Sequence, residues 1–176
     1  MSLYEEQSHP GTQTEGGRSL AFALRSLTLA GFGVYSERTR FTFPAGPAVL
    51  IGPNESGKST MLAGLAAVLF GLPELKDASK FGTARFRSLG HPKEFSGELE
   101  WETDGGRFRL TRHFDTHRVR LVVERDGKIE ELFSGEHNPQ GRSSAGQAFG
   151  EQLQRWIGLG TYELFEQTLC LQQRRN

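Results

Sequence analysis

The stretch that decides the fold is residues 48–60, which read AVLIGPNESGKST. Its first four residues are apolar and lie between Pro47 and Gly52, which is typical of a strand covered on both faces. Residues 52–59 then satisfy the pattern G-x-x-x-x-G-K-[ST]. Apolar residues at helical spacing follow directly. The stretch therefore predicts a phosphate-binding loop between a central strand and a helix.

The residue types in this loop suit phosphate chemistry. Small residues let successive backbone N–H groups curl around a phosphate, and the start of a helix adds partial positive charge. Lys58 would bridge the terminal phosphates, the Ser59 hydroxyl would ligate Mg²⁺, and Thr60 would reach the α-phosphate. The alternative is a glycine-rich turn that only starts a helix; the combined strand, spacing, lysine and hydroxyl favour phosphate binding. The predicted binding residues are Pro53, Asn54, Glu55, Ser56, Gly57, Lys58, Ser59 and Thr60.

Composition narrows the class of protein. The chain has 176 residues, one cysteine, and 21 Lys and Arg against 21 Asp and Glu. One cysteine permits no internal disulfide and no cysteine-based zinc site. A net charge of zero means that any contact with nucleic acid needs a local patch. The longest apolar stretch, residues 61–72, is too short to span a bilayer, so we expect a cytoplasmic protein without membrane contact.

The flanking segments predict an antiparallel region before the loop and a helix after it. Residues 1–19 are polar, and we expect a mobile extension there. Leu27 with Leu29, and Phe41 with Phe43, alternate as in half-buried strands. Leucines and alanines at helical spacing predict a helix over residues 57–70, which Gly71 and Pro73 end.

The second half of the chain predicts a β-meander. Alternating runs cover residues 97–103, 107–114, 117–125 and 128–133, and Asp-Gly sequences favour hairpin turns between them. We expect Phe108, Leu110, Val119 and Leu121 on the buried side. An amphipathic helix is predicted over residues 148–157, a short helix from Tyr162, and an apolar run at residues 169–173, where Cys170 would be a core residue.

Other motifs separate the classes of phosphate-loop protein. A GTPase needs D-x-x-G and N-K-x-D, and the four aspartates (Asp77, Asp104, Asp115 and Asp126) supply neither. None of them follows four apolar residues, so the sequence has no Walker B strand. A site without that acidic group would bind nucleotide yet turn it over poorly.

Four segments of the sequence resemble the N-terminal lobe of SMC/SbcC-type ABC ATPase heads, most closely the YhaN-like branch. These segments are residues 27–33, 41–43, 49–60 and 69–73. The resemblance covers roughly residues 20–173 and implies an α/β P-loop NTPase fold for a lobe over residues 20–176. In that fold an ABC-type N-terminal half-head carries an antiparallel β-subdomain and a β-meander. It also implies that ATP and Mg²⁺ are the cofactors.

The resemblance extends to a Q-loop near the end of the chain. Residues 165–173 are similar to the segment in which a glutamine contacts Mg²⁺ and the attacking water. Gln173 aligns with that position, and Gln172 is the alternative one residue away. The resemblance therefore implies that Lys58 and Gln173 serve catalysis and that Ser59 and Gln173 hold the metal.

The signature motif, Walker B, D-loop and switch histidine of such heads do not occur in this sequence. Residues 95–98 and 133–136 both read FSGE, but each lies at a predicted strand end, where the helix-opening signature motif is not expected. We therefore expect a fragment whose C-terminal lobe completes an ATPase that works in DNA repair or DNA processing. Two heads would form a homodimer around ATP, and this chain alone would be inactive or very weak. A P-loop kinase and a nucleotide-gated scaffold without turnover are the alternatives.

Two further clusters carry weaker signals. His113 and His117 have the spacing of metal ligands, but a third ligand is missing, so a solvated hairpin end is favoured. The arginines Arg107, Arg109, Arg118 and Arg120 are predicted to share a strand face. They would contact DNA phosphates, dock a coiled coil, or form a solvated face paired with glutamates.

Overall fold

The computed structural model of the chain describes residues 22–44, 57–89, 93–162 and 165. In chain order the elements are β1 (Ala23–Ala30), β2 (Thr39–Thr42), α1 (Lys58–Phe70), α2 (Thr83–Phe86), β3 (Ser96–Thr103), β4 (Gly106–His113), β5 (Arg118–Arg125), β6 (Lys128–Glu136) and α3 (Ser144–Ile157). The predicted extension 1–19, the predicted strand 48–51 and the apolar run 169–173 lie outside the described residues.

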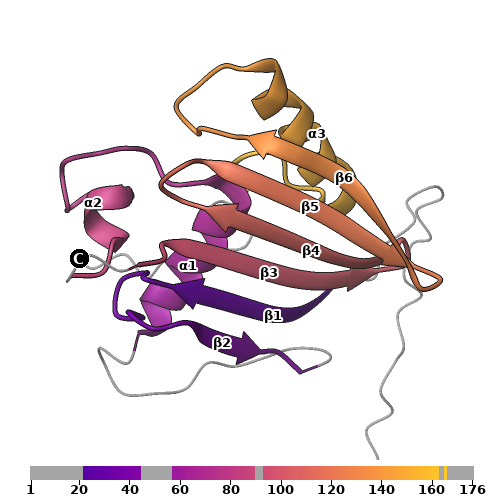
Figure 1. Ribbon diagram of the computed structural model, residues 1–176, viewed down its shortest axis with the longest axis horizontal. Helices are drawn as coiled ribbons and strands as arrows, with labels where there is room; N and C mark the ends of the chain where they lie inside the picture. The colour runs from indigo at the N-terminus through magenta and orange to yellow at the C-terminus, as the bar shows by residue number, and fades with distance from the viewer. Residues whose placement is uncertain (1–21, 45–56, 90–92, 163–164, 166–176) are drawn as a thin grey trace, which may run out of the picture.

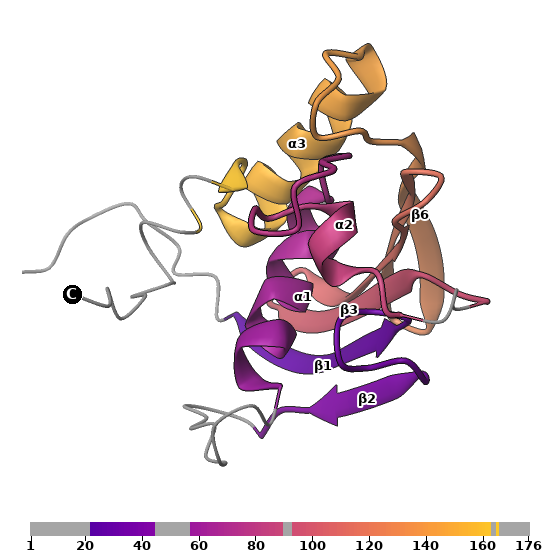
Figure 2. The same cartoon turned by 90° about the vertical axis from the view of Figure 1, so that its left-hand side faces the viewer.

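The strands form one six-stranded sheet in the order β2-β1-β3-β4-β5-β6, and every neighbouring pair is antiparallel. The helix α1 packs behind β3 and β4, and α3 packs against β6 (Figures 1 and 2). The described part of the chain is thus a mixed α/β structure in which a helical layer covers one face of an antiparallel sheet.

Asp-Gly sequences form two of the hairpin turns, as predicted. Asp126 and Gly127 join β5 to β6 with φ values of 50° and 72°, and two residues with positive φ are the mark of a type I′ hairpin. Asp104 and Gly105 join β3 to β4. The strand β6 extends three residues beyond the predicted end at Phe133, because it continues to pair with the start of β5.

The core lies between the sheet and the helices. Trp101 of β3 and Phe108 of β4 are stacked, with ring centroids 5.2 Å apart, and both are fully buried. The predicted buried side of the meander is confirmed, since Phe108, Leu110, Val119 and Leu121 are at most 2% exposed. These apolar side chains provide the surface on which α1 and α3 pack.

Two helices differ from the prediction. The helix α3 begins at Ser144 rather than at residue 148, because the Ser143 hydroxyl accepts a hydrogen bond from the Gly146 N–H and caps the helix. Its first turn carries no large apolar residue, so hydrophobic periodicity did not detect it. The short helix α2 was not predicted at all.

The strand β1 also differs from the prediction. It is buried on both faces toward its end, rather than half-buried, because Ser26 and Thr28 are covered as well as Leu27.

Arg112 of β4 is 1% exposed and reaches the last turn of α1. Its Nε donates to the Val68 carbonyl oxygen at 2.8 Å and its Nη2 to the Leu69 carbonyl oxygen at 3.1 Å. Its guanidinium also lies over the Phe149 ring of α3, 5.2 Å from the centroid. Burial lowers the pKa of Arg112 to about 9, so the side chain remains charged at neutral pH. Arg112 therefore places a cation at the negative end of the helix dipole.

His137, which follows β6, completes the surroundings of this guanidinium. Its carbonyl oxygen accepts from Arg112 Nη1 at 3.2 Å, and its Nδ1 lies 3.2 Å from Arg112 Nη2. Burial, and then the charges of Arg112 and His117, lower the pKa of His137 to about 4. The imidazole is therefore neutral at pH 7 and accepts a hydrogen bond from Arg112 through Nδ1.

Replacing Arg112 by methionine should destabilise the fold. The Arg112→Met side chain fills similar space but leaves the buried Val68 and Leu69 carbonyls without these donors, which should lower the free energy of unfolding by about 3 kcal/mol. Urea unfolding followed by tryptophan fluorescence measures this. The exposed Arg118→Met variant is the matched control and should change stability by less than about 0.5 kcal/mol. Equal stability of the two variants would contradict the role of Arg112.

The stability of the wild-type chain should fall as the pH drops from about 6.5 to about 4. Over this interval the unfolded chain binds a proton at His137 that the native state does not bind, so the free energy of unfolding loses up to about 3 kcal/mol. The His137→Asn variant keeps an acceptor for Arg112 and does not titrate. Its unfolding free energy should therefore fall less steeply than that of the wild type over this interval, and His113→Asn, at an exposed position, is the matched control. Parallel pH profiles for wild type and His137→Asn would contradict the assignment.

Candidate nucleotide-binding site

The described part of the G-x-x-x-x-G-K-[ST] motif lies at the start of α1. Gly57 directly precedes the helix, and Lys58, Ser59 and Thr60 form its first turn. Lys58 and Thr60 are half-buried, whereas Ser59 is exposed. The first turn has no acidic residue, and no side chain caps it within the part of the chain that the structure describes. A helix start of this kind, with a lysine and two hydroxyls, favours a bound anion.

Gly57 adopts a conformation that requires glycine. Its φ is 88° and its ψ is 2°, in the left-handed region that other residues rarely adopt. A Cβ at this position would also meet the ring of Tyr35, whose Cζ would lie 2.9 Å away. The second glycine of the motif is thus explained by both backbone conformation and close packing, and this arrangement fits a phosphate held at the helix start.

The connection between β1 and β2 packs against this helix start. The Tyr35 hydroxyl donates to the Gly57 carbonyl oxygen at 2.9 Å, and burial raises the pKa of Tyr35, which keeps the hydroxyl protonated. Gly33 lies against the Thr60 side chain. Sequence reasoning missed both contacts. The sequence hinted at these contacts only through the two glycines in residues 31–33. The contacts themselves join residues that are far apart in the chain.

Part of the predicted site lies outside the described residues. This applies to Pro53, Asn54, Glu55 and Ser56 of the loop, and to Gln173 with its alternative Gln172. Of the predicted metal ligands, only Ser59 is described, and its hydroxyl suits a hard cation such as Mg²⁺. Within the described residues, no group of three or more His, Cys, Asp or Glu side chains could hold a metal ion.

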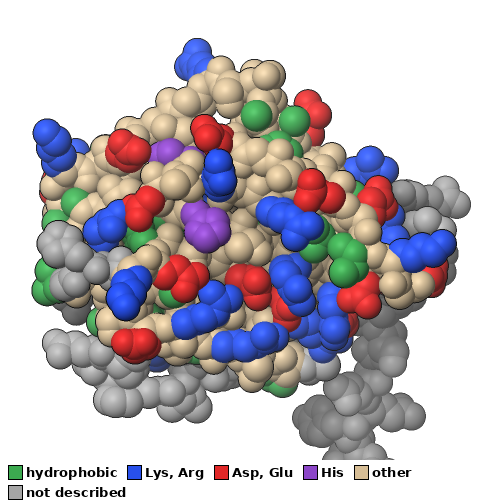
Figure 3. All heavy atoms as spheres, in the orientation of Figure 1, with side chains coloured by type: hydrophobic (Ala, Val, Ile, Leu, Met, Phe, Trp, Pro, Cys, Tyr) green, Lys and Arg blue, Asp and Glu red, His purple; other side chains and the backbone are tan. Residues whose placement is uncertain are grey.

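The predicted arginine face forms ion pairs with glutamates. Arg107 pairs with Glu102 at 2.9 Å and Arg109 with Glu100 at 2.8 Å, both across the β3–β4 ladder. Arg120 pairs with Glu131 of β6 at 2.7 Å. Figure 3 shows this side of the molecule as a mixture of basic and acidic side chains. The structure therefore favours the solvated, ion-paired interpretation of these arginines over a continuous cationic patch.

Glu100 organises much of this face, and sequence reasoning missed it. Its carboxylate accepts from Ser26 at 2.9 Å and pairs with Arg40 at 2.8 Å, in addition to Arg109. Burial tends to raise the pKa of Glu100, but the hydrogen bonds from Ser26 and Arg109 and the two arginine charges outweigh it and lower the pKa. The alternation of glutamates along residues 98–102 was the available signal, since it places Glu100 and Glu102 opposite arginines of β4.

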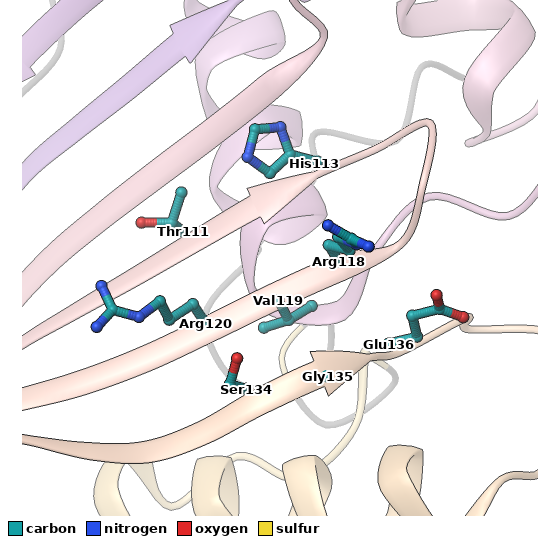
Figure 4. A pocket seen from close by; sticks show the side chains of 8 residues that line it. All are labelled: Thr111, His113, Arg118, Val119, Arg120, Ser134, Gly135 and Glu136. Atoms are coloured by element: carbon teal, nitrogen blue, oxygen red, sulfur yellow. The ribbon is translucent and has the colours of Figure 1, made fainter.

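A shallow hollow of about 560 Å³ lies on the same face over β4, β5 and β6 (Figure 4). Arg118, His113 and Glu136 are among its lining residues. His117 instead bonds to Glu74, with Nε2 and Oε1 3.0 Å apart, and its side chain is mostly buried. The two histidines thus have separate surroundings, and His117 is not solvated as predicted, because it packs against Glu74.

None of the helices in the described residues has the length and apolarity needed to cross a membrane.

Comparison with known proteins extends the sequence resemblance. Residues 26–176 match a family described as an AAA domain. The chain is 50% identical to chromosome partition protein Smc of Rhodopirellula baltica over 46 aligned residues. This alignment covers 26% of this chain and 4% of that protein. It is 42% identical to the uncharacterized protein YhaN of Bacillus subtilis over 57 aligned residues. This second alignment covers 32% of this chain and 6% of that protein.

The aligned part of the chain thus spans only a small fraction of the length of these relatives. The matches nevertheless confirm the resemblance to the N-terminal lobe of SMC/SbcC-type ATPases.

Proposed function

The chain belongs to the AAA domain family, and on this premise we propose that it is the ATP-binding N-terminal lobe of an SMC-like ATPase. One observation carries the proposal. The G-x-x-x-x-G-K-[ST] sequence meets the start of α1 at Gly57, whose left-handed conformation and close contact with Tyr35 leave no room for a side chain. Of the functions weighed from the sequence, ATP binding accounts best for this arrangement together with the family match.

In the proposed site, each residue of the motif has one task. Backbone N–H groups from Asn54 to Gly57 would surround the β-phosphate beside Pro53, which has no N–H to donate, and Lys58 would neutralise charge on the β- and γ-phosphates. The Ser59 hydroxyl and Gln173, or Gln172 one residue away, would hold Mg²⁺, and Thr60 would reach the α-phosphate. When bound, Mg²⁺ supplies positive charge that offsets the negative charge developing on the phosphates.

We propose that the catalytic unit is larger than this chain. The sequence has no Walker B carboxylate, so the acidic groups that orient the attacking water would come from a C-terminal lobe of the same protein. A homodimer of such heads would enclose ATP and couple its hydrolysis to DNA repair or DNA processing in the cytoplasm. The name of the Rhodopirellula relative, a chromosome partition protein, supports a role on DNA.

Replacing Lys58 by alanine should remove nucleotide binding and leave the fold intact. Loss of the lysine charge from the phosphates should weaken Mg·ATP binding about 100-fold, which isothermal titration calorimetry measures directly. Lys128→Ala, at the exposed first residue of β6, is the matched control and should bind as the wild type does. Unchanged affinity in Lys58→Ala would refute the assignment of the site.

The isolated chain should hydrolyse ATP very slowly, because the motif sequence binds phosphates but supplies no acidic water-orienting group. Adding the C-terminal lobe of the parent protein should raise phosphate release at least about 100-fold. The same mixture prepared with Lys58→Ala should stay at the basal rate. Rapid, Lys58-dependent hydrolysis by residues 1–176 alone would show that the catalytic groups lie within this chain.

A further inference from the structure

The β1–β2 connection is built to hold the Tyr35 hydroxyl in place. The backbone N–H groups of Phe32 and Tyr35 each donate to the other residue's carbonyl oxygen at 2.9 Å, which closes a tight loop. The Tyr35 ring packs edge-on against Phe41 of β2, with centroids 5.1 Å apart. Backbone bonds and ring packing therefore fix the phenol before it contacts the helix.

A second set of contacts fixes the same loop against the layer of helices. The Gly33 N–H donates to the Phe86 carbonyl oxygen at 2.6 Å, and the Gly33 carbonyl oxygen accepts from the Ser88 hydroxyl at 2.6 Å. The φ of Gly33 is 56°, and a Cβ there would lie 2.5 Å from Thr60 Cγ2. Only glycine allows the loop backbone to approach the first turn of α1 this closely.

The hydrogen bond from Tyr35 to Gly57 fixes the orientation of the peptide plane between Gly57 and Lys58. The Gly57 carbonyl oxygen accepts from the Tyr35 hydroxyl at 2.9 Å and from the Met61 N–H at 2.8 Å, so both of its lone-pair directions are used. The plane of that carbonyl also contains the Lys58 N–H, which points the opposite way because the peptide is trans. Holding the carbonyl therefore sets the direction of the Lys58 backbone N–H.

We propose that Tyr35 is a positioning residue of the phosphate site, whose hydroxyl orients the Gly57–Lys58 peptide for the bound phosphates. This inference rests on the proposed nucleotide-binding function. Tyr35 acts on the protein before ligand binds, because its bond to Gly57 favours the left-handed conformation that sets the direction of the Lys58 N–H. The apparent affinity for the phosphates is proportional to the fraction of molecules that hold this conformation. A variant in which that fraction is smaller should therefore bind more weakly.

The test compares Tyr35→Phe with the matched control Tyr162→Phe. Each variant loses one phenolic hydroxyl and keeps the ring, and Tyr162 lies at the other end of α1, with its ring centroid 6.1 Å from that of Phe70. Calorimetry measures binding of two probes, Mg·ATP and Mg·tripolyphosphate, of which the second has no nucleoside. Tyr35→Phe should weaken both probes by the same factor, about two- to tenfold, while Tyr162→Phe binds both as the wild type does.

The second probe separates positioning from other roles. Weaker ATP binding with unchanged tripolyphosphate binding would overturn the proposal, because the hydroxyl would then act on the nucleoside. Wild-type affinity of Tyr35→Phe for both probes, with binding still lost in Lys58→Ala, would overturn the positioning role and leave the proposed function standing. Absence of binding by the wild-type chain to either probe would instead refute the proposed function. Thermal unfolding without ligand confirms that the variants being compared are folded.

Discussion

The position of α1 depends on a buried guanidinium whose partners, in the part of the chain that the structure describes, include no carboxylate. In the described residues Arg112 contacts two carbonyls in the last turn of this helix, the backbone and ring of His137, and the face of Phe149. A charge removed from water needs partners, and here backbone dipoles, a neutral imidazole and an aromatic ring supply them. The same side chain therefore joins β4, the end of β6, α3 and the helix that carries the nucleotide-binding motif.

The two ends of α1 are held by different interactions. At its C-terminal end the cation of Arg112 meets the negative end of the helix dipole. At its N-terminal end the Tyr35 hydroxyl keeps its proton and adds no charge, so it does not neutralise the positive end of the dipole. An anionic anchor placed near Gly57 would repel the phosphates of the proposed ligand, whereas a phenol fixes the backbone without adding negative charge.

The sequence was most informative where structure is set by local chemistry. The glycine pattern before Lys58, the Asp-Gly turn at residues 126–127 and the alternation around Phe108 each depend on a few neighbouring residues. The contacts of Arg112 and Tyr35 could not be predicted, because each joins segments that only the tertiary fold brings together. The early start of α3 depends on one cap, Ser143, in a turn that buries nothing large.

The charges of the sheet constrain how this domain could meet a polyanion. Three of the four arginines first identified from the sequence pair with glutamates at 2.9 Å or less. Binding a phosphate there would break pairs such as Arg109 with Glu100 and would leave a carboxylate, already partly buried with Ser26, beside the incoming anion. This repulsion offsets the gain from releasing counterions. These three arginines are poorly suited to contacting DNA, because the glutamates of neighbouring strands already neutralise them.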